Sequence, residues 1–271
     1  MHHRSEEWIL GGWTFVVLGL MLMPILIVAV TSFSAGESLD FPPHGWSLRW
    51  YKALLEEFRY SSTRIGGYLG TALLTSFSIA LVAVTLALFV ALPTSYALVR
   101  HQFKGEILVE QLLSLPIVFP SIALGIGMLL LSSRVGFNWV MGRIILAHIV
   151  AVFPFVVRNI TASLSGIGVS MEEAAMTLGA TRLRAVWEVV LPLVRPGVVA
   201  GAMIAFIFSF NEFTAVYFLS TGTVQPFSMW LFNQAATLNP FVTSISVFMI
   251  LLNVLVLSIM DRLIGAERLM M

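Results

Sequence analysis

Residues 65–99 read IGGYLGTALLTSFSIALVAVTLALFVALPTSYALV, and no charged residue interrupts them between Arg64 and Arg100. A helix rises about 1.5 Å per residue, so about 20 mostly apolar residues cross the roughly 30 Å hydrocarbon core of a bilayer. The segment is long enough to do this. We expect a membrane-spanning helix within residues 68–98 that ends near Pro93.

The composition of the whole chain also indicates a membrane protein. Of its 271 residues, 58% are hydrophobic and 11% are charged, whereas a water-soluble domain carries about 25% charged residues. The 15 lysines and arginines and the 14 aspartates and glutamates leave a net charge of +1, so we expect no nucleic acid partner. Because the chain lacks cysteine, disulfide scaffolds, thiolate nucleophiles and iron–sulfur or zinc–thiolate sites are excluded.

Further apolar runs lie on both sides of this segment. We expect them to cross the membrane at about residues 9–31, 111–133, 138–157, 197–220 and 241–260. The first is too long for the apolar part of a signal peptide, about 7–15 residues. The third is bent, if at all, at Pro116 and Pro120, and in the fourth Arg143 is expected to extend toward an interface. The fold class is therefore all-α, a polytopic protein of six spanning helices in a single domain, residues 1–271.

Basic residues in the connections indicate the side on which the termini lie. With cytoplasmic termini, the inside set is Arg4, Arg100, Lys104, Arg158, Arg182, Arg184, Arg195, Arg262 and Arg268, and the outside set is Arg49, Lys52, Arg59, Arg64, Arg134 and Arg143. The inside set is the larger one. We therefore expect a multi-pass protein with its N-terminus and C-terminus in the cytoplasm.

The connection after the first span carries a periodic pattern. Trp46, Trp50, Leu54 and Phe58 recur at helical spacing, with charged residues elsewhere on the turn. We expect a short helix at the membrane interface whose aromatic side chains anchor it there, with a ligand contact as the alternative.

The longest polar segment, residues 159–195, contains signals for two short helices. Ser170 and Glu173 form the S-x-x-E pattern of a capping box, which predicts a helix starting at Met171. Gly179 suits the left-handed position that ends a helix. The first of these helices therefore has room for about two turns.

A second helix is expected from Arg182 to Leu191. Arg184 and Glu188 are four residues apart on one side, and Pro192 is expected to stop the helix. The other side carries an apolar stripe of Leu183, Val186, Trp187 and Val190. Two short helices of this kind are suited to docking into the groove of a partner.

These residues resemble the EAA loop of membrane permease subunits of binding-protein-dependent ABC importers. In that family the pattern is E-A-A, three residues, Gly, and about nine residues before an ending with Leu-Pro. Here EAAMTLGA at 173–180 and VLP at 190–192 carry it. The match places the loop residues of the family on Glu173, Ala174, Ala175, Gly179, Leu191 and Pro192. The resemblance extends from about Gly66 to the C-terminus and implies the type I importer permease fold and a place in the bacterial cytoplasmic (inner) membrane.

The resemblance also implies a mechanism and a set of partners. The loop would sit in a cleft of a cytoplasmic ATP-binding subunit, and closure of two such subunits would move the spans between inward-open and outward-open states. A second permease subunit, homologous or identical, and an extracytoplasmic solute-binding protein complete the assembly. ATP would be bound by the partners, because this chain has no G-x-x-x-x-G-K-[ST] sequence, and we expect no cofactor in the chain itself. The G-x-x-x-G pairs Gly66/Gly70 and Gly197/Gly201 are suited to close helix contacts, either sliding or static.

Two stretches indicate a class of cargo. SLRWY at 47–51 and FSFNEF at 208–213 resemble permeases of the spermidine/putrescine group, which implies a polyamine or a similar organic cation. That group usually has two acidic residues where this chain has Asn211 and Glu212. A carboxylate at such depth costs about 2.5–3.5 kcal/mol to insert, so Glu212 should face the bundle interior, water or a partner charge. Asn211 and Glu212 are the candidate translocation path; alternatively, Glu212 is tied to an arginine or to backbone.

Other chemistry has less support in the sequence. No second titrating residue lies one turn from His148, so a hydrogen-bonded structural imidazole is favoured over a proton relay. Because the external connections contain no catalytic triad, carboxylate pair or metal-ligand spacing, we expect neither an enzyme nor a metal site. The alternatives within the same class are importers of ferric iron, sulfate or phosphonate. An ion-gradient-driven secondary transporter is the alternative from a different class.

Overall fold

The computed structural model describes residues 2–59 and 69–269, and this part of the chain is helical, without β-strands. The elements are α1 (His2–Thr31), α2 (Arg49–Arg59), α3 (Leu69–Arg100), α4 (Glu106–Val118), α5 (Ser121–Arg134), α6 (Val140–Ser165), α7 (Ser170–Thr177), α8 (Arg182–Ala185), the π-helical turn η1 (Val186–Val190), α9 (Leu191–Asn211), α10 (Thr214–Leu219), α11 (Phe227–Ala235) and α12 (Pro240–Leu269). The chain divides into two compact units, residues 1–64 with 231–255 and residues 65–230 with 256–271.

The first unit contains α1, α2 and the first half of α12. The predicted short helix after the first span is confirmed as α2, and its residues Trp50, Leu54 and Phe58 pack within the unit, whereas Trp46 precedes the helix and is exposed. Trp50 lies against Phe241 and Phe58 against Phe248, with ring centroids 6.4 and 5.7 Å apart. Leu54 between them is buried. These aromatic residues therefore join α2 to α12.

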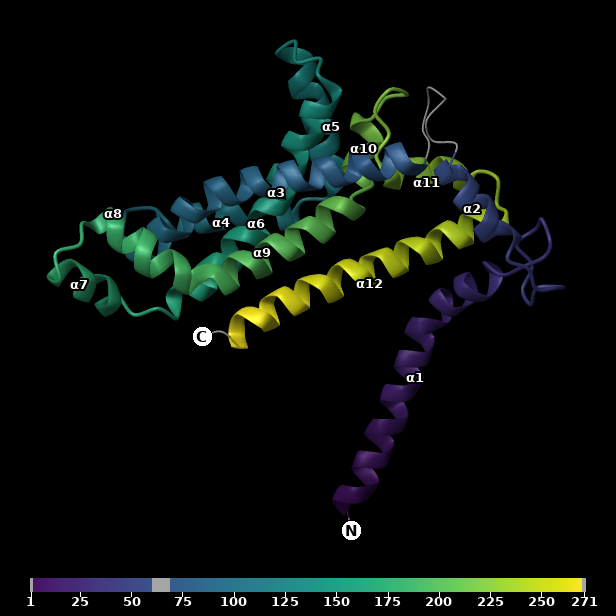
Figure 1. Ribbon diagram of the computed structural model, residues 1–271, viewed down its shortest axis with the longest axis horizontal. Coiled ribbons are helices and arrows are strands. Elements are labelled where there is room, and N and C mark those ends of the chain that lie inside the picture. The colour runs from purple at the N-terminus through teal and green to yellow at the C-terminus, as the bar shows by residue number, and fades with distance from the viewer. Residues whose placement is uncertain (1, 60–68, 270–271) are drawn as a thin grey trace. The chain divides into compact units, whose positions relative to one another are not determined.

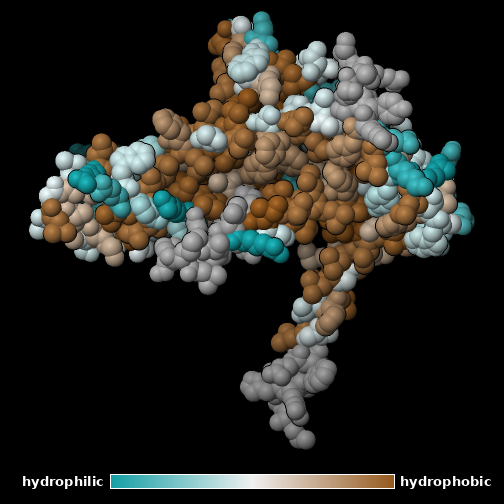
Figure 2. All heavy atoms as spheres, in the orientation of Figure 1, coloured by the Kyte–Doolittle hydropathy of each residue, from teal (hydrophilic) through white to brown (hydrophobic). Residues whose placement is uncertain are grey.

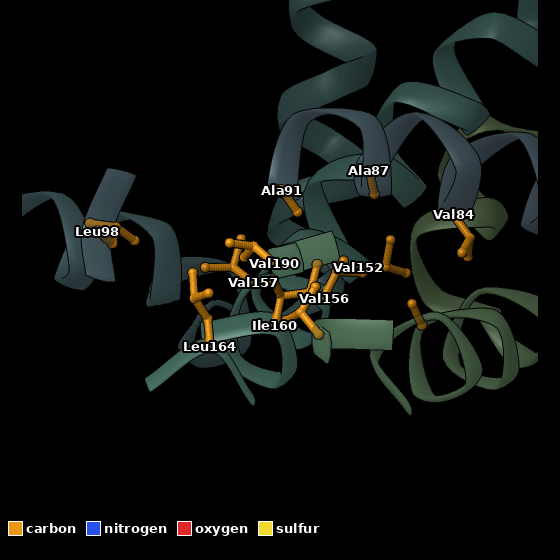
Figure 3. Close-up of a cluster of buried hydrophobic side chains, with 12 residues drawn as sticks. Val84, Ala87, Ala91, Leu98, Val152, Val156, Val157, Ile160, Leu164 and Val190 are labelled. Carbon is orange, nitrogen blue, oxygen red and sulfur yellow. The ribbon is translucent and has the colours of Figure 1, made fainter. Parts of the chain in front are cut away.

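In the second unit, α3, α6 and α9 lie side by side and form the main core. Figure 1 shows α7 and α8 at one end of these three helices and α5 and α10 toward the other. Figure 3 shows the contact surface, where the small residues Ala87 and Ala91 of α3 face the branched residues Val152, Val156 and Ile160 of α6. Small side chains facing branched ones let the helix axes approach closely.

Glycines bring α6 and α9 especially close. A Cβ added at Gly197 would lie 2.3 Å from Cβ of Ser163 and 2.7 Å from the carbonyl oxygen of Asn159, and one at Gly201 would lie 3.2 Å from Cα of Val156. The G-x-x-x-G pair at 197 and 201 therefore forms a close helix contact, as predicted. Gly66 of the other pair lies outside the described residues.

Among the described residues, five helices are long and apolar enough to cross a membrane, or six if α4 and α5 form one bent span. Figure 2 shows apolar side chains over the middle of the second unit and more polar ones toward its α7–α8 end. The first and last predicted spans are confirmed by the apolar stretches Leu10–Thr31 and Pro240–Ile259. The second is confirmed as α3, although the expected end near Pro93 was wrong, since the helix continues to Arg100. Proline is tolerated inside membrane helices, where neighbouring groups compensate for the lost hydrogen bond.

The third predicted span, 111–133, is broken. The two helices α4 and α5 meet at an angle of 102°. Phe119 between them is extended, with φ −72° and ψ 134°, and Pro120 follows. The ring of a proline disfavours helical geometry in the residue before it, so the break lies at Pro120, whereas Pro116 remains inside α4.

The other two predicted spans have different ends from those expected. The fourth runs past Val157 to Ser165, so α6 includes the first residues of the segment that was expected to be a loop from 159. The fifth does not reach Ser220, because α9 ends at Asn211 and Glu212 is extended. Arg143 of α6 is half-buried, and its Nη2 donates a hydrogen bond of 2.9 Å to the carbonyl of Leu219, at the end of α10.

Candidate functional site

The short helix α7 begins without the predicted capping box. Ser170 is its first residue, Val169 before it is already helical, and no side-chain cap is present there among the described residues. The expected reciprocal bonds of Ser170 and Glu173 are therefore wrong, because Ser170 lies one position too far into the helix. Glu172 and Glu173 in the first turn still complement the positive end of the helix dipole.

Glu172 joins α7 to the end of α3. Its Oε1 lies 2.6 Å from Nε of Arg100, and both side chains are only 7% exposed. The hydroxyl of Tyr96 donates a hydrogen bond of 2.8 Å to Oε2 of Glu172. Arg100 also donates through Nη2 to the carbonyl of Ile167, at 2.9 Å, in the connection between α6 and α7. One buried charge pair therefore holds three segments together.

The end of α7 is confirmed at Gly179. Its φ is +95°, a left-handed conformation that glycine adopts without steric cost. The N–H of Gly179 donates to the carbonyl of Met176 and that of Ala180 to the carbonyl of Ala175, each at 3.0 Å. This pair of bonds is the Schellman motif, which satisfies the last carbonyls of a helix.

The turn between α7 and α8 exposes apolar side chains. Leu178 is 89% and Leu183 69% exposed, and Met171 is exposed nearby. Glu173 and Ala174 of the EAA pattern are also exposed, and Ala175 is half-buried. We call Met171, Glu173, Ala174, Leu178 and Leu183 the α7–α8 surface. Large apolar side chains that are exposed at a polar end of a membrane protein are typical of a partner contact.

The second predicted helix starts as expected but does not stop at Pro192. Thr181 caps its start by accepting a hydrogen bond from the N–H of Arg184. The predicted pair of Arg184 and Glu188 is present, with Nε and Oε1 2.8 Å apart on exposed side chains. Through η1 the helix continues into α9, so Arg182 to Asn211 forms one apolar helix of 30 residues.

The π-helical turn explains why proline is accepted there. The N–H of Leu191 bonds to the carbonyl of Val186, five residues earlier. A wider turn of this kind relieves the clash between a proline ring and the preceding turn, and the nitrogen of Pro192 needs no partner. Leu191 and Pro192, both half-buried, therefore lie within a continuous helix and not at its end.

The predicted apolar stripe of the second helix lines a groove. This groove has a volume of about 550 Å³ and lies between α3, α6 and the helix that runs from α8 into α9. Its walls include Leu92, Tyr96, Trp187 and Val190. Trp187 is 63% exposed, whereas Val190 is buried. The stripe therefore faces the interior at Val190 and the groove opening at Trp187.

The candidate path residues lie where α9 ends. Glu212 is extended and 9% exposed, and its Oε1 accepts a hydrogen bond of 2.9 Å from the N–H of Ala215 in the first turn of α10. Its carbonyl accepts another, of 2.8 Å, from Ser228. Asn211 is exposed and donates to the carbonyl of Ile207 at 2.7 Å. Of the two roles considered for Glu212, the geometry shows the tie to backbone.

His148 of α6 lies near the same break. Its Nδ1 is 2.7 Å from Oγ of Ser209, and the imidazole is buried. The predicted hydrogen bond of His148 is confirmed, whereas its Nε2 is buried and has no hydrogen-bond partner within the described part of the chain. The carbonyl of Ser209 in turn accepts from the N–H of Glu212 at 3.3 Å, so His148 and Glu212 are linked through one serine.

Comparison with known proteins identifies the family. Residues 83–266 match the model of the family described as "Binding-protein-dependent transport system inner membrane component". The chain belongs to this family. It is the permease component of an ABC importer and a multi-pass protein of the inner membrane.

Relatives and a solved structure agree with this assignment. The permease is 29% identical to the spermidine/putrescine transport system permease protein PotC of Haemophilus influenzae, over 96% of this chain and 97% of that protein. It is 32% identical to the molybdenum transport system permease protein ModB of the same organism, over 71% of this chain and 92% of that protein. A solved bacterial ABC transporter that imports the acidic polysaccharide alginate has the same fold, with a TM-score of 0.67 at 20% identity over 95% of this chain and 97% of that one.

Glu172, Arg100 and Tyr96 of the permease are residues that sequence reasoning missed. The EAA resemblance drew attention to Glu173, whereas the structure buries its neighbour. Successive helical residues point about 100° apart, so a start that shifts by one residue changes which glutamate faces inward. The sequence contains one signal for this cluster: Arg100 is a charged residue that directly follows a long apolar span.

Proposed function

We propose that this permease forms the translocation path for a small organic cation, a polyamine such as spermidine or putrescine, delivered by an extracytoplasmic solute-binding protein. The observation that carries the proposal is similarity to a spermidine/putrescine permease over 96% of the chain. The resemblance of residues 47–51 and 208–213 to that group supports it. Glu212 adds a carboxylate in the part of the chain where that group has acidic residues.

Two cytoplasmic ATP-binding subunits and a second permease subunit, homologous or identical, complete the proposed importer. The α7–α8 surface is the site at which an ATP-binding subunit docks, with Glu173, Ala174, Ala175 and Gly179 at the contact. Leu191 and Pro192 place that surface relative to α9, because the helix continues through them. Closure of the ATP-binding subunits then moves α7 and shifts the spans between two packings.

Direct measurement of transport tests the cargo. The permease is reconstituted in liposomes with its ATP-binding and permease partners, and the loaded binding protein is added outside. We expect ATP-dependent accumulation of labelled spermidine or putrescine, with ferric iron, sulfate and phosphonate failing to compete. Polyamine accumulation under an ion gradient without the ATP-binding subunits would contradict the importer mechanism.

A second candidate cargo is an oxyanion. The relative that supports it is the molybdenum permease, which is 32% identical over 71% of this chain. Molybdate in the same liposomes distinguishes the two, because an anion should not be drawn to a path that carries the Glu212 carboxylate. Molybdate uptake without polyamine uptake would replace the first proposal with the second.

Substitution at Gly179 tests the docking site. Gly179→Asp adds a side chain and a charge in open space, at φ +95°. We expect the subunit to insert in the membrane while uptake per ATP hydrolysed falls or the ATP-binding subunit no longer binds. Gly136→Asp is the matched control, since Gly136 has φ +71° and also faces open space. Unchanged uptake by Gly179→Asp at normal expression would reject the docking role.

A further inference from the structure

The connection between α6 and α7 is short and rich in glycine. It consists of Gly166, Ile167, Gly168 and Val169, so two of its four residues are glycine. Glycine has the widest backbone freedom of any residue, so this peptide alone transmits a displacement poorly. At its other end α7 leads into the Gly179 turn. The packing of α7 on α8 and η1 leads to α9, whereas a movement that is to reach α3 needs a separate contact.

The backbone of α7 packs against α8 and η1. Its tie to α3 is made by side chains. Arg100 reaches Glu172 through Nε at 2.6 Å and the carbonyl of Ile167 through Nη2 at 2.9 Å. The guanidinium therefore binds both Glu172 of α7 and the carbonyl of Ile167, the residue between the two glycines. Tyr96, one turn earlier on α3, holds the second carboxylate oxygen at 2.8 Å.

The burial of this cluster separates it from ordinary surface pairs. Both charged side chains are 7% exposed, whereas Arg184 and Glu188 are 65% and 59% exposed. Removing two charges from water carries a large desolvation penalty, so a buried pair is weak evidence for stability by itself. Specific buried pairs of this kind are best attested where they fix register or hold a switch in place.

We propose that Glu172, Arg100 and Tyr96 are positioning residues that fix α7 to the C-terminal end of α3, so that a push on α7 moves α3 and, through their shared core, α6. The proposal rests on the proposed docking of an ATP-binding subunit at the α7–α8 surface. Without this cluster, a push on α7 would still reach α9 through α8 and η1, whereas its route to α3 would run through the glycine-containing connection and α6. Because α3 and α6 form the most extensive helix contact of the second unit, the cluster delivers the movement to its core.

The test measures solute transported per ATP hydrolysed by the complete importer in liposomes. Glu172→Gln keeps the shape of the side chain and removes its charge. Arg100→Lys keeps the charge but replaces the separate Nε and Nη2 donors of the planar guanidinium with a single ammonium nitrogen. We expect both to lower transport per ATP at least about fivefold, the lower end of the range typical of coupled sites. Tyr96→Phe, which removes one hydrogen bond, should give a smaller drop in the same direction.

The ratio of solute transported to ATP hydrolysed distinguishes a loss of positioning from a loss of stability. A variant that is merely less stable lowers the amount of complex, and uptake and hydrolysis then fall together with an unchanged ratio. Glu188→Gln breaks the exposed pair and is the matched control, expected to keep the parental ratio. If the Glu172→Gln variant fails to assemble, transport per ATP hydrolysed in Arg100→Lys and Tyr96→Phe tests the positioning role instead. An unchanged ratio in the assembled variants would overturn the proposal.

Gly179→Asp in the same liposomes distinguishes this inference from the docking proposal. Uncoupling by Gly179→Asp together with a parental ratio in Glu172→Gln would reject the positioning role alone. A parental ratio in Gly179→Asp would reject docking at the α7–α8 surface, and the positioning role with it.

Discussion

At the scale of single residues, Glu212 shows how a buried carboxylate at the end of a long apolar helix can be held by backbone and hydroxyl groups. Its Oε1 accepts the N–H of Ala215, and its carbonyl accepts the hydroxyl of Ser228. A buried acceptor that is bonded to backbone avoids the penalty of an unsatisfied polar group. The helix break after Asn211 creates the free N–H groups that this carboxylate satisfies. A role in the path requires Glu212 to face the cargo in another packing of the spans.

Two substitutions separate these roles. Glu212→Gln keeps an oxygen for the N–H of Ala215 but loses the charge, so we expect normal assembly and polyamine uptake reduced at least about tenfold, the factor that about 1.4 kcal/mol of lost attraction gives. Glu212→Ala also removes the cap and should cost about 1 kcal/mol of stability. Uptake by reconstituted importer and thermal unfolding in detergent measure the two effects. Parental uptake in Glu212→Gln would leave Glu212 a purely structural residue.

At the scale of helices, the prolines show why local patterns predict breaks poorly. Pro93, Pro154 and Pro196 lie inside continuous helices, and Pro192 is accepted beside a π-helical turn, whereas Pro120 ends α4. A proline ends a helix only when the neighbouring elements do not supply compensating contacts. The contact of α5 with α10, in which a Cβ at Gly125 would lie 2.9 Å from Cα of Ala215, fixes the direction of the chain after that break.

The glycine contact between α6 and α9 predicts a graded loss of stability when its glycines are replaced by alanine. Gly197→Ala would place Cβ 2.3 Å from Ser163, and Gly201→Ala 3.2 Å from Val156. Overpacking of this kind costs about 1–3 kcal/mol, so we expect Gly197→Ala to be clearly less stable than the parent and Gly201→Ala to lie between them. Gly127→Ala, with nothing within 4 Å, is the control and should be neutral or slightly stabilising. Thermal unfolding of the purified permease variants measures the order of their stabilities. Equal loss at all three positions would argue against a specific close contact.

At the scale of the whole molecule, the apolar helix α9 lies between the α7–α8 turn and the connection after α10. The sequence bias of basic residues predicts that the first lies in the cytoplasm and the second outside. The chain has no cysteine, so single cysteines report these positions cleanly. Thr181 and Thr223 are both exposed.

We expect Thr181→Cys to react with a membrane-impermeant thiol reagent only from the cytoplasmic side. Thr223→Cys should react in intact cells from outside, because α9 has crossed the membrane between them. Labelling in intact cells and in inverted vesicles measures both. Labelling of Thr181→Cys from outside would invert the proposed topology.

The sequence alone determined the membrane class, the positions of the apolar runs and the EAA-like segment with its turn at Gly179. Each depends on local properties: charge-free length, residue spacing and the backbone freedom of glycine. Only the tertiary structure decided that Glu172 faces inward beside Arg100, that the third apolar run bends at Pro120 and that α9 continues through Pro192 but breaks at Glu212. These outcomes depend on which groups, distant in the sequence, supply hydrogen bonds and packing. The residues next to each position in the sequence do not specify those partners.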